Sequence, residues 1–338
     1  MMSMIYIKIL FSIGALNDCL DIGYNILNVL DSEKLNSINY DNSIITKEDF
    51  QMLVVEFVGY IAIVDVLTMK EDVGEFLEIA RKLLPFIPGE YSVFIQLQNL
   101  LKGQTVSVKN ISSDRDLFSG IVSHIVNAFV QYKNKPNEFA QEIYKAKLIA
   151  RASFMFQFEL FADLMIGYAY IQLNSFKKAT AILYKIIKYA KLKGMHAITH
   201  IAWYVLSILN IKEGKFDLAY GVLNNSDIQM EKNGVTSDYL TMLNKVNMYK
   251  VLMCSHSVEQ AQICMNQASH IVQKYGINFN LNIDINKILE ENAARGVINE
   301  TITSENNPEV ESEPDPENSI IPQDADVVDP GEFFSDGN

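Results

Sequence analysis

Apolar residues recur along most of this chain with the spacing of α-helices, and short polar stretches interrupt them. Glycine and proline are scarce, and five of the eight prolines follow residue 307. The pattern therefore predicts an all-α protein in which helices alternate with brief turns. The predicted helices cover residues 2–16, 19–30, 47–68, 71–84, 90–102, 115–132, 137–155, 157–173, 176–192, 196–212, 215–225, 236–253, 257–275 and 284–295.

From residue 114 onward the pattern repeats as pairs of helices. The small residue near the start of each second helix is Ala140, Ala179, Ala219 or Ala261, and these positions are 39, 40 and 42 residues apart. Small residues allow two helices to approach closely, and aromatic residues fill the space between them. The two clearest copies read Ile166-Gly167-x-x-Tyr170 with Ala179-x-x-x-Leu183, and Trp203-x-x-Leu206-Ser207 with Ala219-x-x-x-Leu223.

In these features the chain resembles the tetratricopeptide repeat (TPR). The pattern of that family is an aromatic residue, then Leu-small-x-x-Tyr, then Ala-x-x-x-Phe on the second helix. Two positions depart from it: Asp163 lies where an aromatic is expected, and Asn210 replaces a tyrosine. The resemblance implies a right-handed α-solenoid of antiparallel helix pairs, a TPR-like superhelix.

We expect the chain to have three parts. Residues 1–110 form an N-terminal helical region with degenerate repeats, and residues 111–296 form a TPR-like repeat domain with a C-terminal capping helix. Residues 297–338 hold twelve Asp and Glu and no Lys or Arg. Such a tail cannot bury enough apolar surface to fold, so we expect it to be disordered. It either keeps the protein soluble or folds back over lysines of the repeats.

Charge is distributed very unevenly between these parts. The formal net charge is −13, and subtracting the twelve acids of the tail leaves about −1 for residues 1–296. Phosphate binding needs concentrated positive charge. A nearly neutral body without a basic run therefore argues against nucleic acid as a partner.

Motifs for catalysis and cofactor binding are missing from the sequence. It contains neither a glycine-rich phosphate loop nor a G-x-S-x-G nucleophile elbow. His196 and His200 would share a helix face, as zinc ligands do, but no third ligand is evident, and packing between helices is the favoured alternative. Cys264 and His270 lie on different faces of one predicted helix. We expect no enzymatic activity, no metal and no cofactor.

The location of the protein is predicted from its apolar segments and its cysteines. The run from Ile5 to Leu16 is apolar, but a basic leader and a cleavage site are missing. The most apolar longer run, residues 53–69, contains Glu56 and Asp65, so we expect no direct membrane insertion. Three cysteines form no paired framework. These features favour the cytoplasm, with a periplasmic protein attached to a membrane machine as the alternative.

The resemblance also implies where a protein partner binds. In the TPR family the first helices of the pairs line a concave groove that holds an extended or helical peptide. The matching positions here are aromatic and aliphatic, with lysines along one side. We expect Tyr168 and Tyr204 to be exposed there, because the repeat assigns Gly167 and Leu206 to helix packing; burial in the core is the alternative. The expected groove residues are Phe129, Tyr132, Lys133, Tyr168, Gln172, Tyr204, Ile208, Lys212 and Lys250.

These observations lead to a functional hypothesis. We expect a non-catalytic scaffold that binds a partner peptide or helix in the groove. The composition is typical of bacteria, where some TPR-like proteins are structural parts of large assemblies such as the collar of periplasmic flagellar motors. The alternative is a regulatory TPR sensor that responds to a peptide or ligand, with residues 1–110 as its effector part. The sequence leaves the partner's identity and a homo-oligomeric state open.

Overall fold

A computed structural model describes residues 2–29, 46–69, 72–106, 117–235 and 237–295. These residues form fourteen α-helices and one short 3-10 helix, with no strand among them. The expected all-α fold is therefore confirmed for the described part of the chain. The tail 297–338, which we expected to be disordered, lies outside the described residues.

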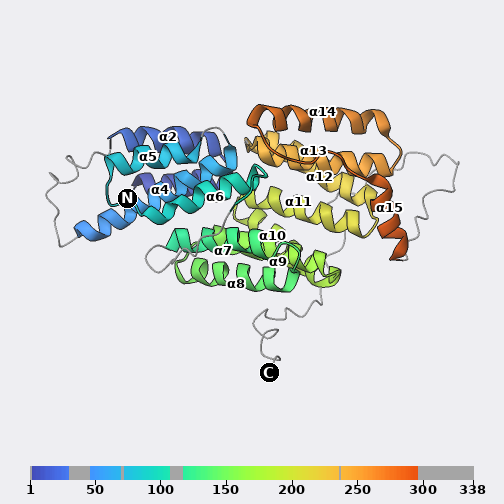
Figure 1. The fold of residues 1–338 in the computed structure, drawn as a ribbon, viewed down its shortest axis with the longest axis horizontal. Coiled ribbons are helices and arrows are strands. Elements are labelled where there is room, and N and C mark those ends of the chain that lie inside the picture. The colour runs from blue at the N-terminus through green and yellow to red at the C-terminus, as the bar shows by residue number, and fades with distance from the viewer. Residues whose placement is uncertain (1, 30–45, 70–71, 107–116, 236, 296–338) are drawn as a thin grey trace, which may run out of the picture. The chain divides into compact units, whose positions relative to one another are not determined.

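The helices follow one another as the sequence pattern predicts, and most pack on their neighbours in the chain (Figure 1). The expected ends agree with the structure to within three residues, with one exception. Residues 215–225 are the start of a longer helix that continues to Asn233. The helices are α1 Met2–Ile13, α2 Leu16–Val29, α4 Lys47–Thr68, α5 Val73–Leu83, η1 Gly89–Tyr91, α6 Ser92–Leu101, α7 Leu117–Gln131, α8 Pro136–Ala152, α9 Phe156–Gln172, α10 Phe176–Leu192, α11 His196–Lys212, α12 Phe216–Asn233, α13 Asp238–Cys254, α14 Val258–Tyr275 and α15 Ile285–Ala294.

One type of turn joins the helices from α8 onward. In each turn a residue with positive φ follows the helix, and the next backbone N–H donates to the carbonyl five residues before it. These bonds measure 2.8–3.0 Å, and their donors recur every 20 residues with a single interval of 22. The donors are Met155, Ser175, Met195, Lys215, Val235, Ser257 and Ile277, and the residues with positive φ are Phe154, Asn174, Gly194, Gly214, Gly234, His256 and Gly276. The repeat is therefore more regular in the backbone than in the sequence.

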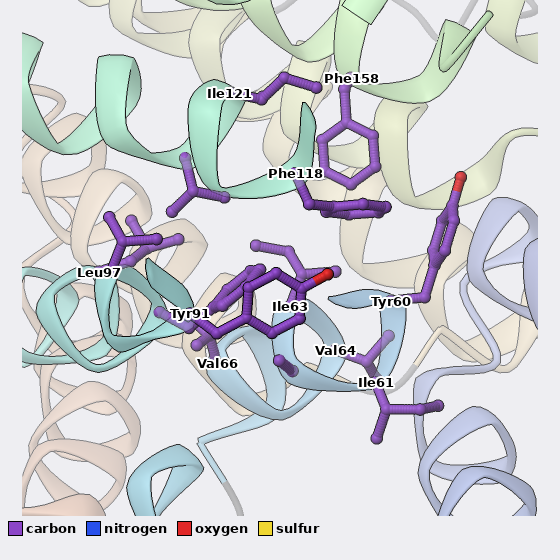
Figure 2. Packing of buried hydrophobic residues seen from close by; sticks show 14 of the residues in the cluster. Tyr60, Ile61, Ile63, Val64, Val66, Tyr91, Leu97, Phe118, Ile121 and Phe158 are labelled. Carbon is purple, nitrogen blue, oxygen red and sulfur yellow. The ribbon is translucent and has the colours of Figure 1, made fainter. Parts of the chain in front are cut away.

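Helix α4 lies at the centre of the N-terminal helices. By length and composition alone it could cross a membrane, but 61% of its most apolar window is buried inside the fold. Aromatic rings from three helices meet beside it, as Figure 2 shows: Phe118 of α7 packs 5.0 Å from Tyr60 of α4 and 5.2 Å from Phe158 of α9. This packing makes α4 a core helix of the described fold.

The N-terminal helices also pack on the last repeats. Met69, which follows α4, shares a buried cluster with Met242 of α13 and Ile271 of α14. The backbone N–H of Asn278 donates to the carbonyl of Lys102 at 2.7 Å. The described N-terminal helices therefore share buried surface with α13 and α14.

Candidate partner-binding surface

Three of the expected first helices, α9, α11 and α13, lie side by side. Their C-terminal halves carry six of the nine expected groove residues, which are Tyr168, Gln172, Tyr204, Ile208, Lys212 and Lys250. The other three come from α7 and its turn. Phe129 is half-buried against Phe139 of α8, with ring centroids 5.0 Å apart, and Tyr132 packs on the same core. Lys133 is exposed.

Tyr168 and Tyr204 are half-buried rather than exposed. The ring of Tyr168 lies 6.4 Å from that of Phe139, and Tyr204 packs against two hydrophobic clusters, one of which contains Leu240. Burial raises the pKa of both phenols, most strongly that of Tyr204. A side chain on a first helix can thus be half-buried by a neighbouring pair, as Tyr168 is by Phe139 of α8 and Tyr204 by Leu240 of α13.

Gln172 and Lys212 occupy equivalent positions on neighbouring first helices, and the structure brings them together. Lys212 Nζ donates to Gln172 Oε1 at 3.0 Å. Burial, and then the nearby charge of Arg295, lowers the pKa of Lys212 below its usual range. The ammonium group therefore lies half out of water with an amide as its hydrogen-bond acceptor.

Lys250 of α13 lies in a similar environment. Its Nζ donates to Asn247 Oδ1 at 2.9 Å, and Asn247 Nδ2 donates in turn to Ser207 Oγ of α11 at 3.1 Å. Burial lowers the pKa of Lys250. Among the described residues no carboxylate lies within 4.0 Å of Lys212 or Lys250. The described part of this surface thus presents two partly desolvated cations without a carboxylate in direct contact, and Glu291 of α15 acts on Lys212 only through its charge at longer range.

Helix α15 covers one end of this surface. Ile285, Ile288 and Leu289 pack against the cluster formed by α11, α12, α13 and α14. Asn292 Nδ2 donates to the carbonyl of Ile211 at 3.1 Å, and Arg295 Nη1 donates to that of Lys212 at 2.8 Å. Carbonyls at a helix end lack partners within the helix. Two side chains from the end of the described chain therefore cap α11, a role that our sequence analysis missed.

Helix α1 packs at the opposite end of the same first helices. The ring of Phe11 stacks on Phe158 of α9 at 5.9 Å, and Gln157 Nε2 donates to Ser12 Oγ at 2.7 Å. α1 also contacts α11. The expected groove is thus flanked by α1 at the N-terminal end of α9 and by α15 at the C-terminal end of α11.

The histidines and cysteines that resemble metal ligands in the sequence do not form a set of ligands in the described residues. His200 Nδ1 lies 3.2 Å from Ser226 Oγ, between α11 and α12. The three cysteines are buried and unpaired, and burial raises the pKa of the Cys19 thiol to about 12 and that of Cys254 to about 11. The described ranges contain no group of three His, Cys, Asp or Glu placed to hold a metal ion.

Comparisons of the chain with protein-family models, with curated proteins and with solved structures find no significant match.

Proposed function

We propose that this protein is a non-catalytic scaffold with a TPR-like, right-handed α-solenoid fold, and that it binds a partner protein along α9, α11 and α13. The observation that carries the proposal is the pair Lys212 and Lys250. Each ammonium group is partly removed from water and has an amide as its hydrogen-bond acceptor. A partly buried cation gains most from an anionic partner, because the attraction is weakly screened there.

The partner segment fits this surface if it carries a carboxylate among apolar residues. Carboxylates would replace the amide acceptors of the two lysines, while Ile208 and the edge of Tyr168 contact apolar side chains. Both residues are half-buried, so part of each remains accessible. A segment of a partner protein would lie in the stretch between α1 and α15 and run across the first helices. The scaffold would serve as an assembly component of a larger bacterial complex, such as a flagellar motor collar.

The alternative is a regulatory sensor, and one contact favours it. Met69 of the N-terminal helices is buried against Met242 of the repeats, so a ligand that shifts α13 would also shift the N-terminal helices. A sensor requires two arrangements of this contact, one for each ligand state.

The test is a cross-linked pull-down from the native cell, read by mass spectrometry. The bait is the full chain, compared with a Lys212→Gln, Lys250→Gln variant. Glutamine keeps a hydrogen-bonding group but removes the charge. Loss of a buried charge pair costs about 2–5 kcal/mol, which weakens binding more than tenfold. We expect one set of captured proteins to disappear with the variant.

The matched control removes three lysines from another face, with Lys177→Gln, Lys185→Gln and Lys188→Gln on α10. Unfolding curves of both variants establish that they fold like the intact chain. A protein that is captured by the intact chain and by the control variant, but not by the Lys212→Gln, Lys250→Gln variant, supports the proposed groove. Equal capture by the intact chain and the groove variant contradicts it. If the intact chain captures no protein, the regulatory sensor becomes the favoured hypothesis.

A further inference from the structure

Helix α10 carries concentrated positive charge, although the net charge of residues 1–296 is close to zero. Between Asp163 and Glu213 the chain has seven lysines and no acidic residue. One of the seven is Lys212 of the groove. The other six lie on α10 or in the turn that follows it, and all six are exposed: Lys177, Lys178, Lys185, Lys188, Lys191 and Lys193. We call these six residues the α10 lysines.

Three of the α10 lysines have no close counter-charge among the described residues, and one of them, Lys185, interacts with Asp163 only at longer range. No carboxylate among the described residues lies within 4.0 Å of Lys177, Lys185 or Lys188. Lys191 Nζ lies 5.1 Å from the centre of the Trp203 ring, an interaction that leaves its positive charge in place. The outer face of α10 is therefore a positive strip along the helix.

Apolar side chains are exposed among these lysines. Leu192 is 76% exposed, Tyr184 55% and Tyr189 41%. Helical spacing places Tyr184, Lys188 and Leu192 along one line of the outer face, since residues four apart are neighbours on a helix. The strip therefore offers both cations and apolar contacts over the 17 residues of α10, a length of about 25 Å.

We propose that this strip binds an acidic segment of a partner protein that carries apolar residues between its carboxylates. The lysines attract Asp or Glu of the partner segment. The exposed Tyr184 and Leu192 contact apolar residues that lie between those acidic residues. The strip and the groove are different surfaces, so this inference does not rest on the proposed function. A scaffold with two such surfaces joins two partners.

The width of the strip favours a single polypeptide segment over a nucleic acid or a membrane. The helices in the equivalent positions of the neighbouring pairs lack such a strip: α12 exposes Asp217 and Glu231, and α8 exposes Glu138, while its exposed cations Lys145 and Arg151 are paired with Glu142 and Glu159. A duplex or a lipid surface that contacted these helices as well would meet their negative charges. All six cations of the strip are lysines, whereas the planar guanidinium of arginine is better suited to phosphate.

The test measures binding of a fluorescein-labelled synthetic peptide to the full chain by fluorescence anisotropy. The peptide has Glu and Leu at helical spacing, and a matched peptide has Gln in place of Glu. We expect saturable binding of the Glu peptide that weakens as salt is added, and little binding of the Gln peptide. The Lys177→Gln, Lys185→Gln, Lys188→Gln variant should bind about tenfold more weakly. The Lys212→Gln, Lys250→Gln variant removes the charges of the proposed groove, which also suits carboxylates among apolar residues. The binding that remains in this variant should be saturable and salt-dependent, and adding the three α10 substitutions to it should weaken that binding about tenfold.

Several outcomes would overturn this assignment. Equal affinity of the intact chain and the α10 variant does so, as does loss of binding only in the groove variant. The same measurement is repeated with single-stranded DNA and with phosphatidylcholine vesicles that contain phosphatidylserine. If either probe binds more tightly than the Glu peptide, and this binding is lost in the α10 variant, the strip binds a different class of partner. Zero-length cross-links in the protein alone, between the α10 lysines and carboxylates of residues 297–338, would mean that this chain supplies its own acidic segment.

Discussion

Gly23 on α2 allows a close approach to α4, and replacing it by alanine tests that packing. A Cβ atom at Gly23 would overlap Ile61 Cδ1 and lie 2.7 Å from Ile61 Cγ1. Ile61 is completely buried, so its side chain has little space into which to move. We therefore expect Gly23→Ala to destabilise the protein although alanine is the better helix former.

The magnitude follows from two opposing effects. Alanine gains about 1 kcal/mol over glycine in a helix interior, and overpacking a filled core costs about 1–3 kcal/mol. Gly23→Ala should therefore lower the free energy of unfolding by up to about 2 kcal/mol. Gly221→Ala on α12 is the matched control, because nothing lies within 4 Å of its Cβ position, and it should stabilise by about 1 kcal/mol. Gly167→Ala should also stabilise, because its nearest neighbour, Leu183 Cδ2, lies at an ordinary 3.4 Å.

Guanidinium unfolding followed by circular dichroism gives the three free energies of unfolding. The Ile61→Ala background provides a second test, because it removes the atoms that the new methyl group would meet. There, Gly23→Ala should become neutral or stabilising, which appears as a favourable coupling energy in a double-mutant cycle. If Gly23→Ala stabilises the chain as much as Gly221→Ala does, the reasoning about this contact is refuted.

Three further predictions concern buried polar groups and are checked by unfolding curves. Burial, and then the charge of His196, lowers the pKa of His200 from 6.5 to about 4. The unfolded chain therefore binds the proton first, and stability present above pH 6.5 should fall by about 3 kcal/mol as the pH drops to 4, a slope that His200→Gln should flatten. Lys147 pairs with the partly buried Asp163 at 2.8 Å, so Lys147→Met should cost about 3 kcal/mol, and the loss should shrink in a chain with Asp163→Leu. Asn292→Ala should cost about 1–2 kcal/mol, because it removes a buried donor to the end of α11; no loss would show that α15 is not fixed there.

Much of the fold was predictable because its helices are amphipathic and its turns are short. The predicted ranges 176–192 and 196–212 match α10 and α11 at both ends. The regular turns were harder to recognise, because Phe154, Asn174 and His256 adopt the positive φ that glycine adopts elsewhere. A search for glycine at fixed intervals therefore finds only part of the repeat.

The C-terminal end of α12 could not be predicted from the local sequence. The run Asn224-Asn225-Ser226-Asp227 has the composition of a turn, and we predicted the helix to end at residue 225. In the structure Ser226 is fully buried and accepts a hydrogen bond from Asn244 at 3.2 Å, while Asp227 pairs with Lys245 at 2.6 Å. Because these partners lie on α13, the residues that favour the helix are distant in sequence.

The candidate groove was predictable to the extent that it follows from the repeat. Gln172 and Lys212 are 40 residues apart, and equivalence between two copies is enough to place them together. The departure at Asp163 has a physical reason as well: Lys147 on the preceding helix supplies its counter-charge. The contacts of α1 and α15 with the first helices join segments far apart in the chain, and no periodicity contains that information.

These two contacts decide how a partner can reach the proposed groove. Phe11 stacks on the third residue of α9, whereas Arg295 binds the last carbonyl of α11, so the two flanking helices lie at opposite ends of the first helices. α1 belongs to the central hydrophobic cluster, whereas α15 is fixed by a few partly buried apolar side chains and by two hydrogen bonds to α11. Displacing α1 would therefore expose far more apolar surface than displacing α15. A partner that needs more room than the groove provides should enter from the α15 side, and its binding should release the carbonyls of α11 that Asn292 and Arg295 cap.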